Sequence, residues 1–341
     1  MSDIRWGILG LGRIAHKFAQ DLQTLPDRYA ASGTAAALLH AVASTDPTRA
    51  HEFAAQYGVP HAYGTYEGLL TCPDLDVVYI ATPHPGHHPA TLMCLNGGLP
   101  VLCEKPFAMN CRQVDDMVSA ARSNNVFLME ALWSRFMPTT LKALELVGAG
   151  AIGKLKGMRA DFGFKAPFLP DKRGFSKHLG GGSLMDIGIY PLWLSYLFLG
   201  KPERIQAQAI IGPTGVDEQC GMLLTYADGQ MAVLNSTFVH KTDTDAYLYG
   251  ETGSIYIQGR FHESQRLILK PLEGEEQSFD FPRQTWGYNY EAAHVMQCLR
   301  EGRTESPLWS LTDSLNLIDL LDAVRQETGI YYEEDDLDST L

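Results

Sequence analysis

Residues 4–15 read IRWGILGLGRIA, and this stretch decides the fold of the first half of the chain. Its apolar run predicts a buried strand over residues 4–9, followed by a GxGxxA turn. Glycines at such a junction let the backbone turn tightly and approach a diphosphate, which the amides of the next helix can bind. A glycine turn between a strand and a helix can also form without any ligand. We expect a dinucleotide to contact Gly10, Gly12, Arg13, Ile14 and Ala15.

The same alternation of short apolar runs and helical stretches continues to about residue 130. It predicts parallel strands joined by crossover helices, and therefore a doubly wound Rossmann sheet of the α/β class. The predicted strands are residues 4–9, 38–43, 77–81, 101–104 and 127–130. The predicted helices are residues 14–23, 47–57, 88–96 and 111–124.

Beyond residue 150 alternating strands dominate, and an Asp228-Gly229 hairpin signal lies between two of them. They predict an α+β domain with a large, mainly antiparallel open sheet. Its strands are expected at residues 155–164, 204–211, 222–226, 231–237, 247–249, 254–257, 267–270 and 277–281. One helix, residues 183–199, interrupts this series, and two more follow at 288–300 and 311–328. We expect a dinucleotide-binding domain at 1–127 and a substrate-binding and oligomerisation domain at 128–341.

Composition excludes several classes of protein. The net charge of -13, with no Lys/Arg-rich run, argues against nucleic acid and anionic membrane as partners. No uninterrupted apolar stretch reaches the roughly 20 residues of a membrane helix, and no secretion signal follows Met1, so we expect a cytoplasmic location. The six cysteines form no CxxC pair, which favours buried free thiols. The acidic residues 333–338 are interpreted as a solvated tail.

The end of the second strand bears on the choice between NAD and NADP. A carboxylate there would bind the ribose of NAD, whereas NADP needs donors and positive charge for its 2'-phosphate. The chain has Ser44 and Thr45 at this point, with Arg49 one turn further. Asp46 stands before Pro47 and can serve as a helix cap instead. We predict NADP as the cofactor, with NAD as the alternative.

Two further strands end in residues suited to a ligand at the carboxyl edge of the sheet. Thr82 is followed by His84, His87 and His88, which lack the Asp, Glu or Cys companions of a metal site. We therefore expect no metal, and a cofactor contact from Thr82 and His87. The next strand ends in Glu104-Lys105-Pro106, where the proline keeps Lys105 out of helical geometry.

A glycine-rich segment opens the helix of the second half. Its sequence, GGGSLMDIGIY at residues 180–190, suggests close approach of backbone to substrate. Asp186 and Tyr190 are four residues apart and so share a helix face. A carboxylate and a phenol on one face could bind a diol and exchange its proton, although a surface Asp and a core Tyr would show the same spacing.

These motifs, in this order, resemble the family of glucose-fructose oxidoreductase and inositol 2-dehydrogenase over essentially the whole chain. Within it, the chain is most similar to the dimeric dihydrodiol dehydrogenase and NADP-dependent D-xylose dehydrogenase branch, through residues 104–106, 129–136, 290–295 and 305–307. The resemblance implies that the cofactor is lined by Gly10, Gly12, Ala15, Ser44, Thr82, His87, Glu104 and Lys105. It also implies a cis Lys105-Pro106 bond, and a reacting carbon surrounded by Lys105, Asp186 and Tyr190.

The predicted function is hydride transfer between nicotinamide C4 and a carbinol or carbonyl carbon of a small polyol, sugar or trans-dihydrodiol. Tyr190 would be the general acid/base. A free phenol has a pKa of about 10, which the Lys105 ammonium would lower. We expect substrate contacts from Trp133, Arg135 and Phe164, and a homodimer or larger homo-oligomer. The alternative is a non-catalytic dinucleotide-sensing regulatory protein on the same fold.

Overall fold

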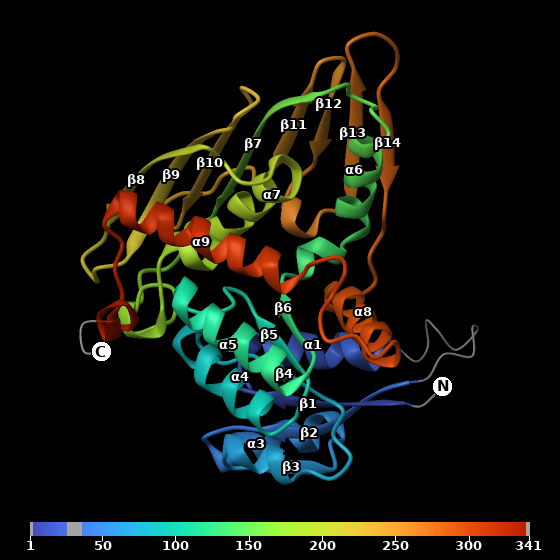
Figure 1. Ribbon diagram of the computed structural model, residues 1–341, viewed down its shortest axis with the longest axis vertical. Helices are drawn as coiled ribbons and strands as arrows, with labels where there is room; N and C mark the ends of the chain where they lie inside the picture. Colours follow the sequence, from blue (N-terminus) through green and yellow to red (C-terminus); the bar gives the residue numbers. More distant parts are fainter. Residues whose placement is uncertain (1–2, 26–35, 339–341) are drawn as a thin grey trace. The chain divides into compact units, whose positions relative to one another are not determined.

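The computed structural model describes residues 3–25 and 36–338, which divide into two units (Figure 1). The first contains the chain up to Trp133 and returns for residues 283–315. The second contains residues 134–282 and the chain from Asn316 onward. Each unit has its own sheet, and each is described by itself.

The first unit is built on a six-stranded parallel sheet in the order β3-β2-β1-β4-β5-β6, which confirms the doubly wound fold. Its strands are β1 (Ile4–Leu9), β2 (Ala37–Ala43), β3 (His61–Tyr63), β4 (Val77–Ile80), β5 (Val101–Glu104) and β6 (Leu128–Ala131). The helices between them are α1 (Arg13–Gln23), α3 (Pro47–Tyr57), α4 (His87–Asn96) and α5 (Cys111–Asn124). Of these six strands, β3 was not predicted, because three residues at the edge of a sheet are too few to show a periodicity.

The later segment of the first unit contains α8 (Tyr288–Arg300). Asp21, buried on α1, accepts backbone N–H groups at the start of α8, from Gly287 and Tyr288 at 2.7 Å each and from Trp286 at 2.9 Å. The predicted domain boundary at residue 127 placed α8 in the second domain instead. The capping carboxylate lies 267 residues earlier in the chain, so no local pattern could reveal this return.

The second unit has an eight-stranded mixed sheet in the order β14-β13-β12-β11-β7-β10-β9-β8. Only β7 and β10 pair in parallel, as expected for a mainly antiparallel sheet. Its strands are β7 (Leu155–Gly163), β8 (Arg204–Ile211), β9 (Asp217–Thr225), β10 (Met231–Thr237), β11 (Ala246–Gly250), β12 (Gly253–Ile257), β13 (Arg266–Pro271) and β14 (Gln277–Asp280).

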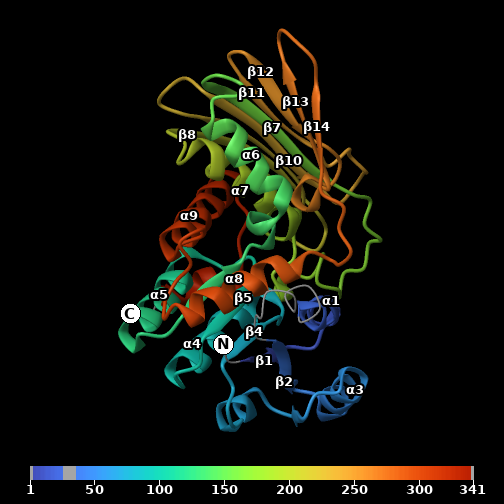
Figure 2. The same cartoon turned by 90° about the vertical axis from the view of Figure 1, so that its right-hand side faces the viewer.

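Helices cover one face of this sheet (Figure 2). α7 (Ile189–Leu199) packs against β7 and β10, and α6 (Pro138–Gly148), which the sequence analysis missed, packs against β13. The helix predicted from residue 183 instead begins with a π-helical turn, Leu184–Gly188. Lys177–Leu199 is apolar and long enough for a membrane span, but 72% of its most apolar stretch is buried in the protein, as in a core helix.

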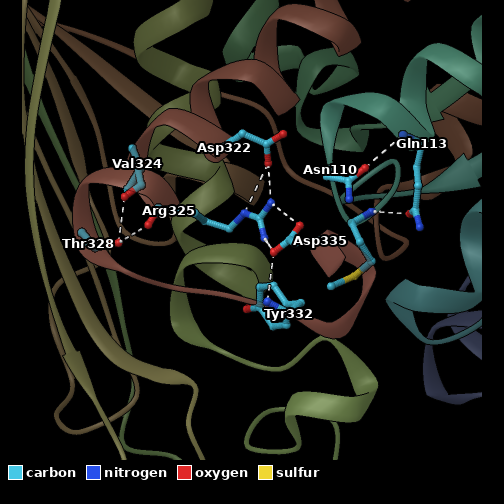
Figure 3. Close-up of polar contacts among 9 residues, drawn as sticks. Asn110, Gln113, Asp322, Val324, Arg325, Thr328, Tyr332 and Asp335 are labelled. Carbon is cyan, nitrogen blue, oxygen red and sulfur yellow. Dashed lines mark hydrogen bonds and ion pairs between the residues drawn. The ribbon is translucent and has the colours of Figure 1, made fainter. Parts of the chain in front are cut away.

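The acidic C-terminal end is not only a solvated tail, as Figure 3 shows. The Arg325 guanidinium, on α9 (Leu311–Thr328), pairs with Asp322 at 2.7 Å and with Asp335 at 2.8 Å. Asp335 also accepts the backbone N–H of Tyr332 at 3.0 Å. A buried arginine needs compensating charge, so the structure uses Asp335 as an internal partner.

Candidate active site

The two glycines of the first turn serve different purposes. Gly10 has a φ of +89°, and a Cβ added there would lie 2.8 Å from backbone atoms of Ala81 and Thr82, so only glycine fits between β1 and β4. At Gly12 an added Cβ would meet no described atom within 4 Å. Gly12 also begins α1 without a side-chain cap from the described residues, which leaves its first amides for a ligand. This open helix end fits the diphosphate of a dinucleotide.

The residues after β2 form a polar turn at the start of α3. Asp46 caps this helix, as expected, by accepting the backbone N–H groups of Thr48 at 3.0 Å and Arg49 at 3.3 Å. The Ser44 hydroxyl accepts the backbone N–H of Asp46 at 3.1 Å. The Arg49 side chain is 60% exposed and lies 4.0 Å from Asp46, so its guanidinium can reach a ligand.

Tyr66, at the start of the short 3-10 helix Tyr66–Thr71, contacts this turn and was not among the predicted site residues. Burial raises the pKa of its phenol, while a hydrogen bond with Thr45 and the charge of Arg49 oppose the rise. The phenol therefore stays a hydrogen-bonding group near the two residues assigned to a 2'-phosphate. A tyrosine that opens a six-residue 3-10 helix lies outside every motif, so no local pattern pointed to it.

The histidines after β4 do not converge on a common point. His87 is buried, and its two ring nitrogens face the carbonyl oxygens of Pro106 at 2.8 Å and Thr82 at 3.0 Å. His88 pairs with Asp116 on α5 at 3.2 Å. His87 thus holds the turn after Lys105 against the end of β4, and a contact between His87 and the cofactor stays a prediction.

Lys105 is buried at the end of β5, and its bond to Pro106 is cis, as the resemblance implied. Both carboxylate oxygens of Glu104 are engaged next to it. One accepts the backbone N–H of Lys105 at 3.2 Å, and the other accepts the phenol of Tyr79. Burial raises the pKa of Tyr79 well above its ordinary value, so the phenol remains a donor. Tyr79 lies within an apolar strand, which concealed it from motif analysis.

Two more carboxyl groups are buried in the first unit. Glu291, on α8, is fully buried, and neither of its carboxylate oxygens has a hydrogen-bond partner among the described residues. Burial and the charge of Glu104 raise the pKa of Glu291 well above its usual range, which favours the protonated form of this carboxyl group. Burial also raises the pKa of Glu130, to about 7.

In the second unit, the glycine-rich segment packs against the protein itself. Cβ atoms added at Gly181 and Gly182 would lie 2.6 Å from the Arg173 carbonyl oxygen and 2.3 Å from the Asp217 carboxylate. Asp217 is buried and accepts the backbone N–H of Leu184 at 2.7 Å. Internal packing therefore already requires these glycines, and an approach of substrate to their backbone stays a prediction. Gly182 in particular lets the backbone approach Asp217, whose carboxylate accepts the first N–H of the π-helical turn.

Tyr190 is buried at the start of α7, with Phe162 at 5.7 Å and His262 at 4.9 Å between ring centroids. No sequence motif pointed to His262, which lies in the short 3-10 helix Phe261–Glu263. Asp186, on the preceding turn, forms an ion pair with Arg173. The phenol is therefore surrounded by rings, while the carboxylate has a cationic partner.

The predicted substrate contacts differ in environment. Trp133 is buried and stacks on Tyr288 at 4.6 Å between centroids, and Arg135 is buried in the turn Trp133–Phe136. Phe164 is 40% exposed beside Phe238 and can touch a ligand. The predicted pair of Lys105 and Tyr190 draws one residue from each unit, and their mutual contact stays a prediction.

Residues 4–132 match the model of an oxidoreductase family with an NAD-binding Rossmann fold, and residues 140–256 match the GFO/IDH/MocA C-terminal domain. The chain is 39% identical to a trans-1,2-dihydrobenzene-1,2-diol dehydrogenase of Xenopus tropicalis, with 96% of this chain and 99% of the relative covered. Identity to the human enzyme of that name is 36%, with 97% and 99% covered.

Among solved structures, the chain resembles the 3-ketoreductase KijD10 of Actinomadura kijaniata in complex with NADP and TDP-benzene. The TM-score is 0.84 at 25% identity, covering 96% of this chain and 98% of the other. An aldose-aldose oxidoreductase of Caulobacter crescentus gives the same TM-score, identity and coverage. The chain is an NAD(P)-dependent oxidoreductase that belongs to the GFO/IDH/MocA family.

Proposed function

We propose that the protein catalyses NADP-dependent oxidation of a trans-dihydrodiol or a related small polyol or sugar, and the reverse reduction. The observation that carries this proposal is the environment of Tyr190, a buried phenol packed against Phe162 and His262. A phenol shielded from water can exchange a proton with one bound hydroxyl without competition from solvent. The names of the relatives support the dihydrodiol as substrate.

In this mechanism the chain supplies the proton chemistry. A nicotinamide nucleotide held at Gly10, Gly12 and the first amides of α1 would supply the hydride acceptor for oxidation. Tyr190 Oη takes the proton of the reacting hydroxyl, and the Lys105 ammonium favours the phenolate that can do so. Asp186, oriented by Arg173, binds the neighbouring hydroxyl of the diol. During reduction the same groups act in the opposite direction, and Tyr190 returns the proton.

Aromatic rings support a substrate with an apolar face. They form a continuous chain in the second unit, in which neighbouring ring centroids lie between 5.1 and 6.3 Å apart. Its members are Phe162, Phe164, Phe238, Phe175 and Phe168. Two of them, Phe164 and Phe168, are exposed. Exposed rings can pack on the cyclohexadiene ring of a dihydrodiol or on the CH face of a sugar.

The polar turn after β2 supports NADP. Asp46 is occupied as a helix cap, while Thr45, Tyr66 and Arg49 offer hydroxyls and a cation in one place. A 2'-phosphate needs such donors, whereas NAD needs a free carboxylate.

The function is tested by following NADPH fluorescence with trans-dihydrodiols, aldoses, inositols and dicarbonyls, for the wild type and Tyr190→Phe. We expect turnover of at least one diol or sugar, and its near-complete loss in the variant while NADPH still binds. Dinucleotide binding without turnover of any compound in the panel would favour the regulatory alternative and overturn the proposal.

We also propose that the face of the eight-stranded sheet opposite α7 binds a second copy of the chain. On β10, Ala232 and Leu234 are buried whereas Val233 is 57% exposed. Strand register places the outward side chains in one row across the sheet. That row is Val233, Arg159, Tyr247, Tyr256 and Ile268. A row rich in apolar and aromatic side chains, with an arginine stacked on Tyr247 at 4.6 Å, suits an oligomer interface.

A further inference from the structure

Three side chains of the metal-ligating type meet at the edge of the parallel sheet, outside every residue assigned to cofactor or substrate. They are His40 on β2, His61 at the start of β3, and Cys72 directly after the short helix Tyr66–Thr71. One ligand atom from each lies within 4.8 Å of the other two, and the imidazole rings are 4.8 Å apart between centroids. No other group of three such side chains occurs in the parts of the chain that the structure describes.

A β-bulge places His40 in this group. Trp6 pairs with Leu39 and the next residue, Gly7, pairs with Ala41, so His40 is the extra residue of β2. Ala41 pairs with His61, so their side chains lie on the same face of the sheet. In a regular strand, the side chain of His40 would point to the other face. The bulge breaks that alternation and lets the two rings pack edge to face.

Hydrogen bonding prepares His40 to act as a ligand. Its Nε2 lies 3.0 Å from the carbonyl oxygen of Pro73, the residue after Cys72. A ring that donates Nε2–H to this carbonyl retains the lone pair of Nδ1. Histidines bound to metals are usually oriented in this way, by a carbonyl or carboxylate on the other nitrogen.

We propose that His40, His61 and Cys72 bind one zinc ion or a similar borderline-soft divalent cation, with water as the fourth ligand. Two imidazoles and a thiolate are the donors that such cations prefer, whereas Mg²⁺ and Ca²⁺ require oxygen ligands. A tetrahedral zinc site separates its N and S ligands by about 3.5 Å, so modest side-chain rotation closes the group around the ion. The Cys72 thiol loses its proton to solvent when the ion binds.

The expected consequence is a link between three separate segments of the first unit. β3 has only three residues and, at the edge of the sheet, forms strand hydrogen bonds with β2 alone. An ion held by β2, β3 and the segment at Cys72 binds the folded state only, and it therefore raises the unfolding temperature. The proposed reaction does not use this site.

The test uses the full-length protein, freed of metal by chelation and kept reduced with a phosphine. It is titrated with Co²⁺, which reports a thiolate ligand through a near-ultraviolet charge-transfer band. We expect one equivalent to bind, the band to vanish in Cys72→Ser, and affinity to fall by more than about 10-fold in His40→Gln and His61→Gln. Cys111→Ser and His51→Gln are the matched controls and should behave like the wild type. Zn²⁺ should displace Co²⁺ and raise the unfolding temperature of the wild type and of the controls only.

A wild type that binds no Co²⁺, or a charge-transfer band that survives in Cys72→Ser, would overturn the proposal. Circular dichroism of the metal-free variants shows whether each one folds. If Cys72→Ser does not fold, the two histidine variants decide the outcome, because undiminished affinity in both contradicts the site.

Discussion

The carboxylate of Glu130, at the end of the parallel sheet, accepts the indole N–H of Trp309 at 3.1 Å, although 179 residues separate them. It also accepts the hydroxyl of Ser314 at 2.7 Å and the backbone N–H of Phe107 at 3.2 Å. These donors favour the ionised form, but burial outweighs them and raises the pKa of Glu130 to about 7. The group therefore couples the stability of the first unit to pH.

Glu130→Gln should remove that coupling. A folded-state pKa above the unfolded value gives stability that is complete at low pH and is lost as pH rises to the folded pKa. Between about pH 4.5 and pH 7, the free energy of unfolding of the wild type should fall relative to the variant by roughly 3 kcal/mol. Urea unfolding of both proteins at several pH values in this range measures the difference in free energy. Glu52→Gln, on the exposed surface of α3, should retain the wild-type slope. If the free energy of unfolding changes with pH in the same way in the wild type and in Glu130→Gln, the raised pKa of Glu130 is contradicted.

Lys105 and Tyr190 should behave as one catalytic unit. Tyr190→Phe removes only the proton carrier, so turnover should fall by about 100- to 10,000-fold while NADPH binding is nearly unchanged. Turnover of Lys105→Met should fall by a comparable factor. Turnover of the double variant should be only slightly lower than that of the slower single variant. Lys105→Met should also recover some oxidation rate at high pH, where hydroxide ionises the phenol. Wild-type turnover in Tyr190→Phe, measured where chemistry limits the rate, would leave Lys105 or Asp186 as the proton carrier.

Arg49→Ala should weaken NADPH selectively. The guanidinium is exposed at the start of α3, and a charge-assisted hydrogen bond to a 2'-phosphate is worth about 10-fold or more in affinity. Dissociation constants for NADPH and NADH, determined by fluorescence titration, measure the change. Arg122→Ala, which alters an exposed arginine on α5, is the control. Equal losses for both cofactors, or a wild-type preference for NADH, would disprove the NADP assignment.

Catalytic activity should survive exhaustive chelation. The proposed proton transfer uses Lys105, Asp186 and Tyr190, and the proposed zinc site is made of other residues. Dialysis against EDTA should therefore lower the unfolding temperature without lowering turnover at a temperature where the protein stays folded. Activity that disappears with EDTA and returns with zinc would place a metal in the reaction.

The protein should be at least dimeric at micromolar concentration. Val233→Glu puts a charge on the exposed row of β10, and burying it unpaired in an interface is unfavourable, so the variant should dissociate to monomers. Multi-angle light scattering measures the mass of both. Arg122→Glu, a charge change on α5 of the first unit, should leave the mass unchanged. A monomeric wild type would remove the proposed interface.

Much of the fold follows from the sequence alone. The strands β1 and β5 and the helices α3, α5, α8 and α9 were predicted with the bounds that the structure shows. Buried parallel strands are short apolar runs that end in glycine, proline or a polar residue, and helices carry caps at their ends, so both leave local patterns. The GxGxxA turn was readable for the same reason, because its conformation is set within a few residues.

The tertiary structure decided what no local pattern encodes. The cap of α8 by Asp21, the raised pKa of the buried Glu291 beside Glu104 and the close approach of Gly182 to Asp217 depend on residues far apart in the chain. The meeting of His40, His61 and Cys72 depends on a bulge and on β3, neither of which has a sequence signature. A residue's helix or strand preference acts over a few neighbours, whereas the burial and charge that give these side chains their chemistry arise only when distant segments pack together.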